Sequence, residues 1–223
     1  MKTTKTTGHI EAYASSSSFN AFAAMTRTTN AVGNETRRRL IAGGLTEFHA
    51  RGFHGTGVDA IARTASVPKG SFYNHFESKQ TFCAEIVDAY FERHRGKLDL
   101  FFNDRSLAPL DRLRAYLDER IEYFTRVELK RGCLMGNLSL ELADHEEAVR
   151  SRLKDRFDEW AGIFADCIES AQSAGQVSSA FRPSELAGFI LNSWEGAILR
   201  MRVERTVKPL EIARDFILQS LLR

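Results

Sequence analysis

The sequence predicts an all-α fold of about nine helices, and three observations lead to this prediction. Apolar residues recur at helical spacing almost without interruption from Asn34 onward. No run of five or more residues alternates apolar and polar between turn residues, as a half-buried strand would. The four prolines stand where helices should begin, a position that tolerates a fixed φ and a missing N–H: Pro68, Pro109, Pro183 and Pro209.

Residues 1–33 are rich in Thr, Ser and Ala and carry no apolar periodicity, which predicts a flexible tail with Met25 as an alternative start. The first helix is expected from Asn34 to Gly52, because asparagine caps helices and glycine ends them. Thr56 should open a second helix through a capping box with Asp59.

A third helix is predicted over residues 69–76, and Ser78 should cap a fourth that continues toward Phe101. Downstream, apolar stripes and turn residues mark five more helices. These cover Pro109 to Leu129, Cys133 to Leu142, a long helix capped by Asp144 and Glu147 and ending near Gly175, and two helices beginning at Pro183 and Pro209.

Composition narrows the class of protein. The 223 residues are 43% hydrophobic and 27% charged, which is typical of a globular protein. Three separated cysteines without a CxxC pattern argue against disulfides and thiolate zinc sites, so a cytoplasmic location without cofactor or metal is expected. No apolar run is long enough to span a membrane. The net charge is +3 over residues 34–98 and −3 over residues 99–223, so a polyanion would bind the first part.

Residues 56–76 have the spacing of a helix-turn-helix, in which the second helix enters the major groove of DNA. Lys69 can reach phosphates or guanine, and Gly70 allows close approach of its backbone to a phosphate. Ser71 and Asn74 are candidates for contacts with bases. Four further side chains are expected at phosphates or helix N-termini: Thr56, Tyr73, His75 and Lys79. The alternative is a helical hairpin whose aromatic residues only form core.

The segment TASVPKGSFYNHFESKQTF closely resembles the TetR family of bacterial transcriptional repressors. Residues that match the family pattern in register are Ala65, Val67, Gly70, Tyr73, His75, Phe76 and Lys79. Ser66 stands where the family usually has glycine; if that position needs φ > 0, serine costs on the order of 1 kcal/mol. Pro68 replaces the usual Ser or Thr cap of the recognition helix.

The resemblance implies a three-helix DNA-binding head at residues 34–82 and a helical-bundle body at residues 83–223 that binds an effector and dimerises, without catalytic residues. Small residues in the last two helices suit close packing against a second copy. They are Ala187, Gly188, Ser193, Gly196 and Ala197.

The segment around Cys133 looks like the branch of the family that includes the repressor of N-ethylmaleimide reductase, in which a cysteine senses electrophiles. Lys130, Arg131 and a helix N-terminus should lower the pKa of the thiol; alternatively, Cys133 only fills a tight helix entry. Other candidates for contact with an effector are Phe102, Phe124, Met135, Trp160, Phe164 and Trp194.

These features together predict a homodimeric repressor that binds a near-palindromic operator in double-stranded DNA and is released by a small molecule or an electrophile. Two alternatives remain: a protein that uses DNA as a platform for a protein partner, and a cysteine-based redox sensor.

Overall fold

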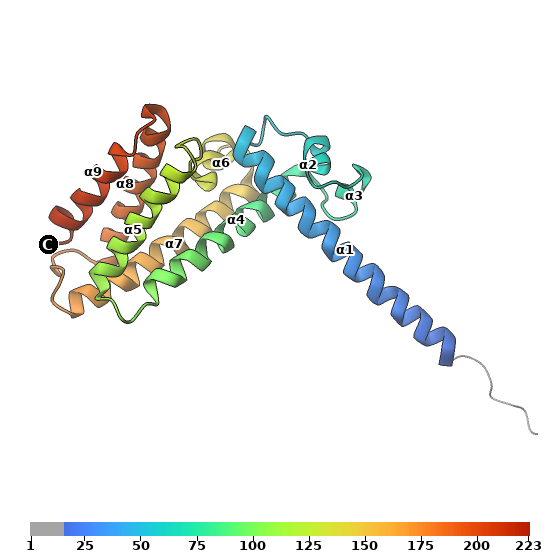
Figure 1. The fold of residues 1–223 in the computed structure, drawn as a ribbon, viewed down its shortest axis with the longest axis horizontal. Helices are drawn as coiled ribbons and strands as arrows, with labels where there is room; N and C mark the ends of the chain where they lie inside the picture. The colour runs from blue at the N-terminus through green and yellow to red at the C-terminus, as the bar shows by residue number, and fades with distance from the viewer. Residues whose placement is uncertain (1–15) are drawn as a thin grey trace, which may run out of the picture.

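The computed structural model describes the backbone of residues 16–223 and the side chains from residue 33 onward. Within this part of the chain the fold is all-α, as predicted, without strands (Figure 1). None of its helices combines the length and apolar composition needed to cross a bilayer. The elements are α1 (Ser16–Arg51), α2 (Val58–Thr64), α3 (Gly70–Tyr73), α4 (Lys79–Phe102), α5 (Pro109–Arg126), α6 (Leu134–Leu142), α7 (Glu147–Ser173), α8 (Pro183–Glu204), α9 (Lys208–Phe216) and a final π-helical turn, η1 (Ile217–Leu221).

The first helix begins at Ser16, well before the predicted start at Asn34. The prediction relied on the lack of an apolar stripe, which argues against burial and not against helix formation in an alanine-containing segment without proline. The predicted tail covered residues 1–33; residues 16–33 are helical instead, and residues 1–15 lie outside the described residues. Gly52 has φ +71° and Gly175 has φ +70°, so both glycines follow helix ends as expected.

Besides Asn34, two predicted helix caps are wrong, and one is confirmed. The N-cap of α2 is Gly57 without a side-chain bond, and the N-cap of α7 is Glu146, so neither Thr56 nor Asp144 acts as predicted. Ser78 caps α4 by accepting a hydrogen bond from the Thr81 amide at 3.0 Å. The third helix is shorter than residues 69–76, because turn hydrogen bonds replace the helical pattern after Tyr73.

We call residues 34–82 the head and residues 83–223 the body. In the head, α2 and α3 pack on α1, and aromatic rings from α3, the turn after it and the start of α4 meet edge to face. The Phe76 and Phe82 ring centroids are 4.6 Å apart, and Phe72 lies 5.0 Å from Phe82. Gly44 lets α1 approach α4, because a Cβ there would collide with the Phe82 ring.

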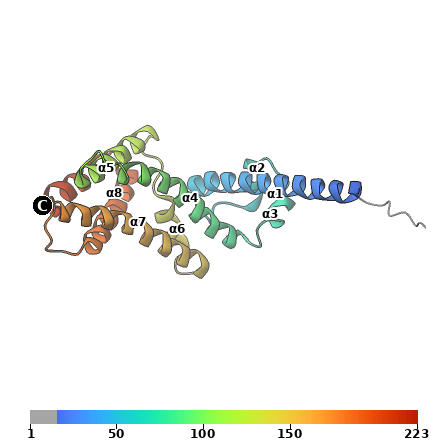
Figure 2. The same ribbon diagram turned by 90° about the horizontal axis from the view of Figure 1, so that it is seen from below.

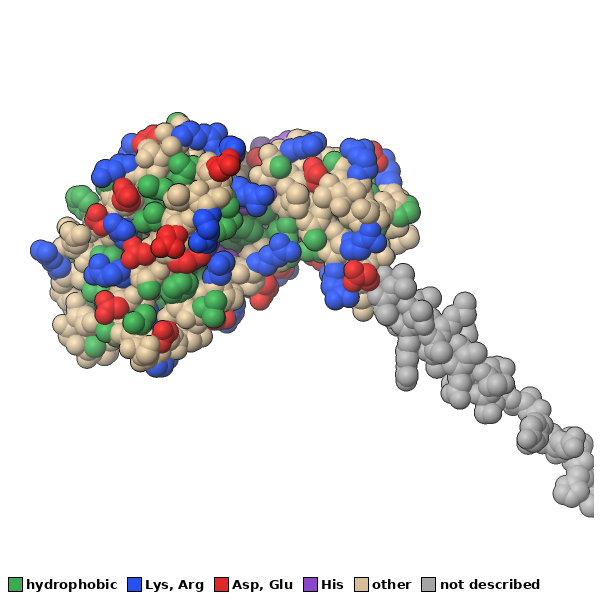
Figure 3. Space-filling view, in the orientation of Figure 1, with side chains coloured by type: hydrophobic (Ala, Val, Ile, Leu, Met, Phe, Trp, Pro, Cys, Tyr) green, Lys and Arg blue, Asp and Glu red, His purple; other side chains and the backbone are tan. Residues whose placement is uncertain are grey.

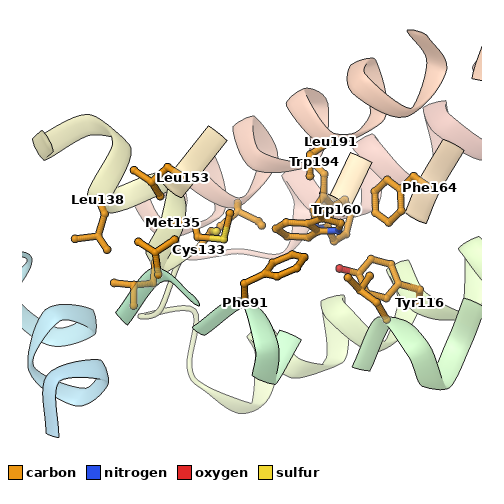
Figure 4. Close-up of a cluster of buried hydrophobic side chains, with 14 of the residues drawn as sticks. Phe91, Tyr116, Cys133, Met135, Leu138, Leu153, Trp160, Phe164, Leu191 and Trp194 are labelled. Carbon is orange, nitrogen blue, oxygen red and sulfur yellow. The ribbon is translucent and has the colours of Figure 1, made fainter. Parts of the chain in front are cut away.

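In the body, α4 packs along α7, α7 along α8, and α8 along α9, while α5 covers α4 and α7 (Figures 1 and 2). The bundle encloses a second aromatic cluster around Phe91, Tyr116, Trp160 and Trp194 (Figure 4). Because α4 begins in the head and continues into the body, one helix connects the two parts directly.

Candidate functional site

The turn between α2 and α3 orients the recognition helix. Ser66 has φ +53°, which is the left-handed conformation. The family usually has glycine at this position, and glycine adopts such a φ without steric cost. The Arg39 guanidinium donates to the Ser66 carbonyl at 2.6 Å and ties this turn to α1. Phe72 is fully buried, so α3 is anchored by one ring and its opposite side faces solvent.

The outward edge of α3 and of the turn that follows it contains five of the predicted DNA-contacting residues. Tyr73 is 57% exposed, Asn74 is exposed, and Ser71 and His75 are half-buried. A Cβ on Gly70 would meet no atom within 4 Å, so the fold itself does not require glycine there. We call Gly70, Ser71, Tyr73, Asn74 and His75 the recognition edge.

Lys69 lies beside this edge and is exposed. Its ammonium is 3.1 Å from the Asp59 carboxylate, a pair whose members are each 57% exposed. Solvent-exposed pairs of this kind contribute little to stability. Lys69 can therefore exchange Asp59 for a phosphate at small cost.

Two side chains that were predicted to contact phosphates, those of Thr56 and Lys79, form hydrogen bonds within the protein. Thr56 is buried, and its hydroxyl donates to the Gly52 carbonyl at 2.7 Å. The Lys79 ammonium donates to the carbonyls of Phe53 and Thr56, at 3.0 Å each, and lies 4.0 Å from the Phe53 ring centroid. Thr56 ties the α1–α2 loop to the end of α1, and Lys79 holds the same loop against α4, because unpaired carbonyls there would be costly.

A cavity of about 490 Å³ opens where head and body meet, lined by α1, α4, α5, α7 and α8 and by the segment before α6. Figure 3 shows a hollow with hydrophobic side chains between the two lobes and with Lys and Arg around it. Leu45, Thr46, His49 and Ala50 of α1 form part of the wall. A bound molecule would therefore contact the helix on which the head is built.

Four of the predicted effector residues line this cavity: Cys133, Phe124, Trp160 and Trp194. The other three, Phe102, Met135 and Phe164, are buried in the core and are not among the lining residues. Apolar spacing marks a helix face as buried, but it cannot distinguish the part of that face that touches a neighbouring helix from the part that borders a cavity.

Cys133 is the N-cap of α6 and accepts the Gly136 amide at 3.5 Å. Burial, together with the Glu195 carboxylate, raises the pKa of the Cys133 thiol well above its usual value. The predicted lowering of this pKa is wrong, because Lys130 pairs with Glu128 and Arg131 is exposed, so neither charge outweighs burial. Burial also raises the pKa of Glu195 to about 7.

The cavity also holds polar residues that sequence reasoning did not single out. The Tyr116 hydroxyl and His94 Nε2 form a hydrogen bond of 2.9 Å. Burial, with Arg120 and Lys97 nearby, lowers the pKa of His94 to about 3, and burial with Arg131 and Arg202 lowers that of His49 to about 4. Both imidazoles are therefore neutral at pH 7. His94 lies on α4 and His49 on α1, far apart in the sequence, so no local motif indicates that they share a cavity.

The α8–α9 face carries a concentration of exposed apolar side chains. Five of the nine large hydrophobic residues that are exposed in the described chain lie on these two helices: Phe189, Leu199, Val203, Ile212 and Phe216. Of the small residues predicted to pack against a second copy, Gly196 is exposed, and Gly188 and Ser193 are half-buried. Ala187 and Ala197 are buried in the protomer's own core, so they cannot serve that purpose.

A helix-turn-helix with a solvent-facing recognition edge, joined to an α-helical body, defines a class of DNA-binding regulator. Residues 40–86 match the family described as bacterial regulatory proteins, tetR family, and residues 109–217 match the Tetracyclin repressor-like C-terminal domain. The chain belongs to the TetR family, whose members are transcriptional regulators and not enzymes.

Several curated relatives carry related names. The chain is 37% identical to the HTH-type transcriptional repressor DhaR of Mycobacterium sp. (strain GP1), over 83% of this chain and 92% of the relative. It is 38% identical to the transcriptional regulator AcuR of Cereibacter sphaeroides, over 77% and 78%. It is 28% identical to the HTH-type transcriptional repressor NemR of Escherichia coli K12, over 81% and 90%.

Solved structures of TetR-type regulators share the fold of this chain. A regulatory protein TetR from Rhodobacter sphaeroides superposes with a TM-score of 0.77 at 36% identity, covering 82% of this chain and 96% of that one. The reduced form of Escherichia coli NemR gives a TM-score of 0.73 at 27% identity, covering 82% and 94%.

Proposed function

We propose that the protein is a homodimeric repressor that binds a near-palindromic operator through the recognition edge and leaves it when a ligand enters the cavity. The observation that carries the DNA-binding part is the orientation of α3. Phe72 points into the core, while Gly70, Tyr73 and Asn74 face solvent. Glycine without a packing role and polar side chains facing outward suit close contact with a phosphate backbone and base edges.

The experiment for DNA binding selects sites from a random duplex pool and then measures affinity by fluorescence anisotropy. Gly70→Ala should weaken binding by about tenfold or more, because a methyl group would stand where the backbone approaches the DNA. Gly96→Ala is the matched control, since a Cβ there also meets nothing within 4 Å and the residue lies in α4 of the body. Equal affinity of the two variants would remove α3 from the interface.

Salt dependence separates phosphate contacts from other contributions. Lys69→Ala should lower affinity similarly for all sequences and reduce the slope of log K against log salt by about 1. Lys154→Ala, at an exposed lysine on α7, should leave the slope of log K against log salt unchanged.

The dimer should form through α8 and α9. Phe189, Ser193 and Gly196 follow one another at helical spacing, and Phe189 and Phe216 border an apolar depression of about 410 Å³. An exposed apolar face of this kind is typical of an interface. Light scattering after size exclusion should show Phe216→Glu as a monomer, while Leu140→Glu, at another exposed apolar position on α6, stays dimeric.

Release follows if the ligand binds better to an arrangement in which the two recognition edges no longer fit successive major grooves. The contacts of α1 with the cavity support this coupling. A second connection is the hydrogen bond of 3.0 Å from the His54 amide to the Glu141 carboxylate of α6. Movement of α1 or α6 around a ligand would therefore shift the head.

Covalent sensing by Cys133 is a second candidate input, favoured by the position of its thiol in the cavity wall. The raised pKa makes reaction slow at neutral pH unless the proton is transferred to Glu195. Cys133→Ser should keep operator binding and lose release by N-ethylmaleimide. Cys167→Ser, at a buried cysteine outside the cavity lining, provides the control. Unchanged release in Cys133→Ser would exclude this thiol as the sensor.

A further inference from the structure

The charges around the cavity are unequal. Six cationic side chains line it, and no Asp or Glu is among the described lining residues. The cations are Arg93, Lys97, Arg120, Lys130, Arg131 and Arg202. Arg120 is buried and Lys97 and Arg202 are half-buried, whereas Arg93, Lys130 and Arg131 are exposed. Solvent and salt screen the exposed charges more than the buried one.

Carboxylates of the protein compensate only some of these cations. Glu119 pairs with Arg120 at 2.5 Å and with Lys97 at 3.4 Å, and Lys130 pairs with Glu128. Arg93 and Arg131 have no carboxylate within 4.0 Å among the described residues. The two histidines that line the cavity are neutral at pH 7, so they add neither positive nor negative charge to it. The cationic side chains that line the cavity therefore outnumber the carboxylates that pair with them.

An unpartnered donor lies inside. Trp160 is 3% exposed, lines the cavity, and its indole N–H has no hydrogen-bond partner among the described residues. Figure 4 shows its nitrogen on the side of the ring that faces the Tyr116 hydroxyl. The Trp160 ring centroid is 4.2 Å from that of His94, whose Nε2 bonds Tyr116. A buried N–H without an acceptor is unfavourable, so an acceptor atom of a ligand would be stabilised there.

The remaining lining is aromatic and apolar. Tyr90, Tyr123, Phe124 and Trp194 stand beside the polar groups just described. Flat rings of this kind bind the apolar body of a ligand, while a few polar groups fix its orientation.

We propose that this cavity binds a small organic carboxylate, with its charge near Arg93, Lys97 and the Trp160 N–H and its apolar body against the aromatic rings. This inference rests on the proposed function, in which the cavity receives the releasing ligand. A cationic ligand would meet six like charges. A neutral ligand would leave the surplus charge uncompensated. A carboxylate supplies both the missing counter-charge and an acceptor for the indole.

Direct binding can be measured without DNA, because both tryptophans of the chain line the cavity. Benzoate, hexanoate and 1-naphthoate are titrated while intrinsic fluorescence is recorded, each beside its neutral amide. At least one carboxylate should give a saturable change, with an affinity about tenfold or more above that of its amide. Equal affinities for all three pairs, or no saturable change with any acid, would overturn the proposal.

Variants test the charge directly. Lys97→Gln and Arg93→Gln should each weaken binding of the carboxylate and leave binding of the amide unchanged. Arg114→Gln, which alters an exposed arginine of α5 outside the cavity lining, is the matched control. Equal loss for acid and amide in the cavity variants would contradict a charge contact and indicate an altered fold.

DNA binding is scored separately from ligand binding. If the protein selects an operator but binds carboxylates no better than their amides, the proposed carboxylate ligand is refuted and the proposed repressor function is retained. Selective carboxylate binding by a protein without operator preference would support the cavity assignment and refute the proposed function.

Discussion

The head and the body place charged and aromatic residues in opposite ways. In the head, aromatic rings fill the centre and polar side chains face outward from a four-residue helix. In the body, aromatic rings and cations together surround an internal space at the junction of several helices. The difference shows that a surface interface can depend on one local turn, whereas a cavity depends on the packing of distant segments.

The largest expected effect distinguishes the two aromatic clusters. Phe72→Ala should destabilise the protein by about 3–5 kcal/mol, because the ring is fully buried. Specific DNA binding should be lost even where the protein remains folded, since Phe72 anchors α3. Phe164→Ala in the body should cost a similar free energy of unfolding yet keep operator binding at low temperature. Urea denaturation and anisotropy measure the two effects, and full DNA affinity in Phe72→Ala would contradict the anchoring role.

Lys79 tests whether a side chain of the matched family pattern serves the fold or the DNA. Lys79→Ala should reduce the free energy of unfolding by about 1–3 kcal/mol, because two loop carbonyls lose their donor. The slope of DNA affinity against salt should not change. Lys154→Ala is the control, since that lysine makes only an exposed pair with Asp158. A reduced slope without loss of stability would restore the phosphate contact predicted from the sequence.

Glu195 tests the buried charge of the body. Its pKa is raised from 4.5 to about 7, so the folded protein retains a proton that the unfolded chain has already released. The resulting stabilisation is present below about pH 4.5 and is lost as the pH rises through about 7. Glu195→Gln does not titrate and should exceed the wild type in stability by on the order of 1–3 kcal/mol at pH 8.

The same comparison at pH 4 should show little difference, because Glu195 is then protonated. Glu169→Gln, at an exposed position of α7, should change neither value. Thermal melts at the two pH values measure the effect. A pH-independent difference between Glu195→Gln and the wild type would contradict the raised pKa.

The smallest expected effect concerns the turn of the head. Ser66→Gly should stabilise the protein by about 1 kcal/mol, because glycine adopts φ +53° without the steric cost of a Cβ. Ser71→Gly, within α3, should destabilise it by a comparable amount. Operator affinity should be unchanged in Ser66→Gly, since the Arg39 bond is made to the backbone carbonyl. A loss of stability in Ser66→Gly would contradict the strain argument.

The sequence by itself determined the helices of the body, the helix ends at Gly52 and Gly175, the Ser78 cap and the position of the recognition helix. Each of these features depends on helix propensities and turn residues that lie within a few positions of it in the sequence. The segment that matches the TetR family also located most of the recognition edge. The same reasoning placed the side chains of Thr56 and Lys79 at phosphates together with Tyr73, although Thr56 is buried and Lys79 is half-buried.

Only the tertiary structure decided which of these polar residues face outward and which hold the loop. It also brought His49, His94, Trp160 and Arg120 from four helices to one cavity and placed Cys133 beside Glu195. The physical reason is that spacing along a helix reports which face is buried, while burial, charge compensation and pKa depend on neighbours that are distant in the sequence.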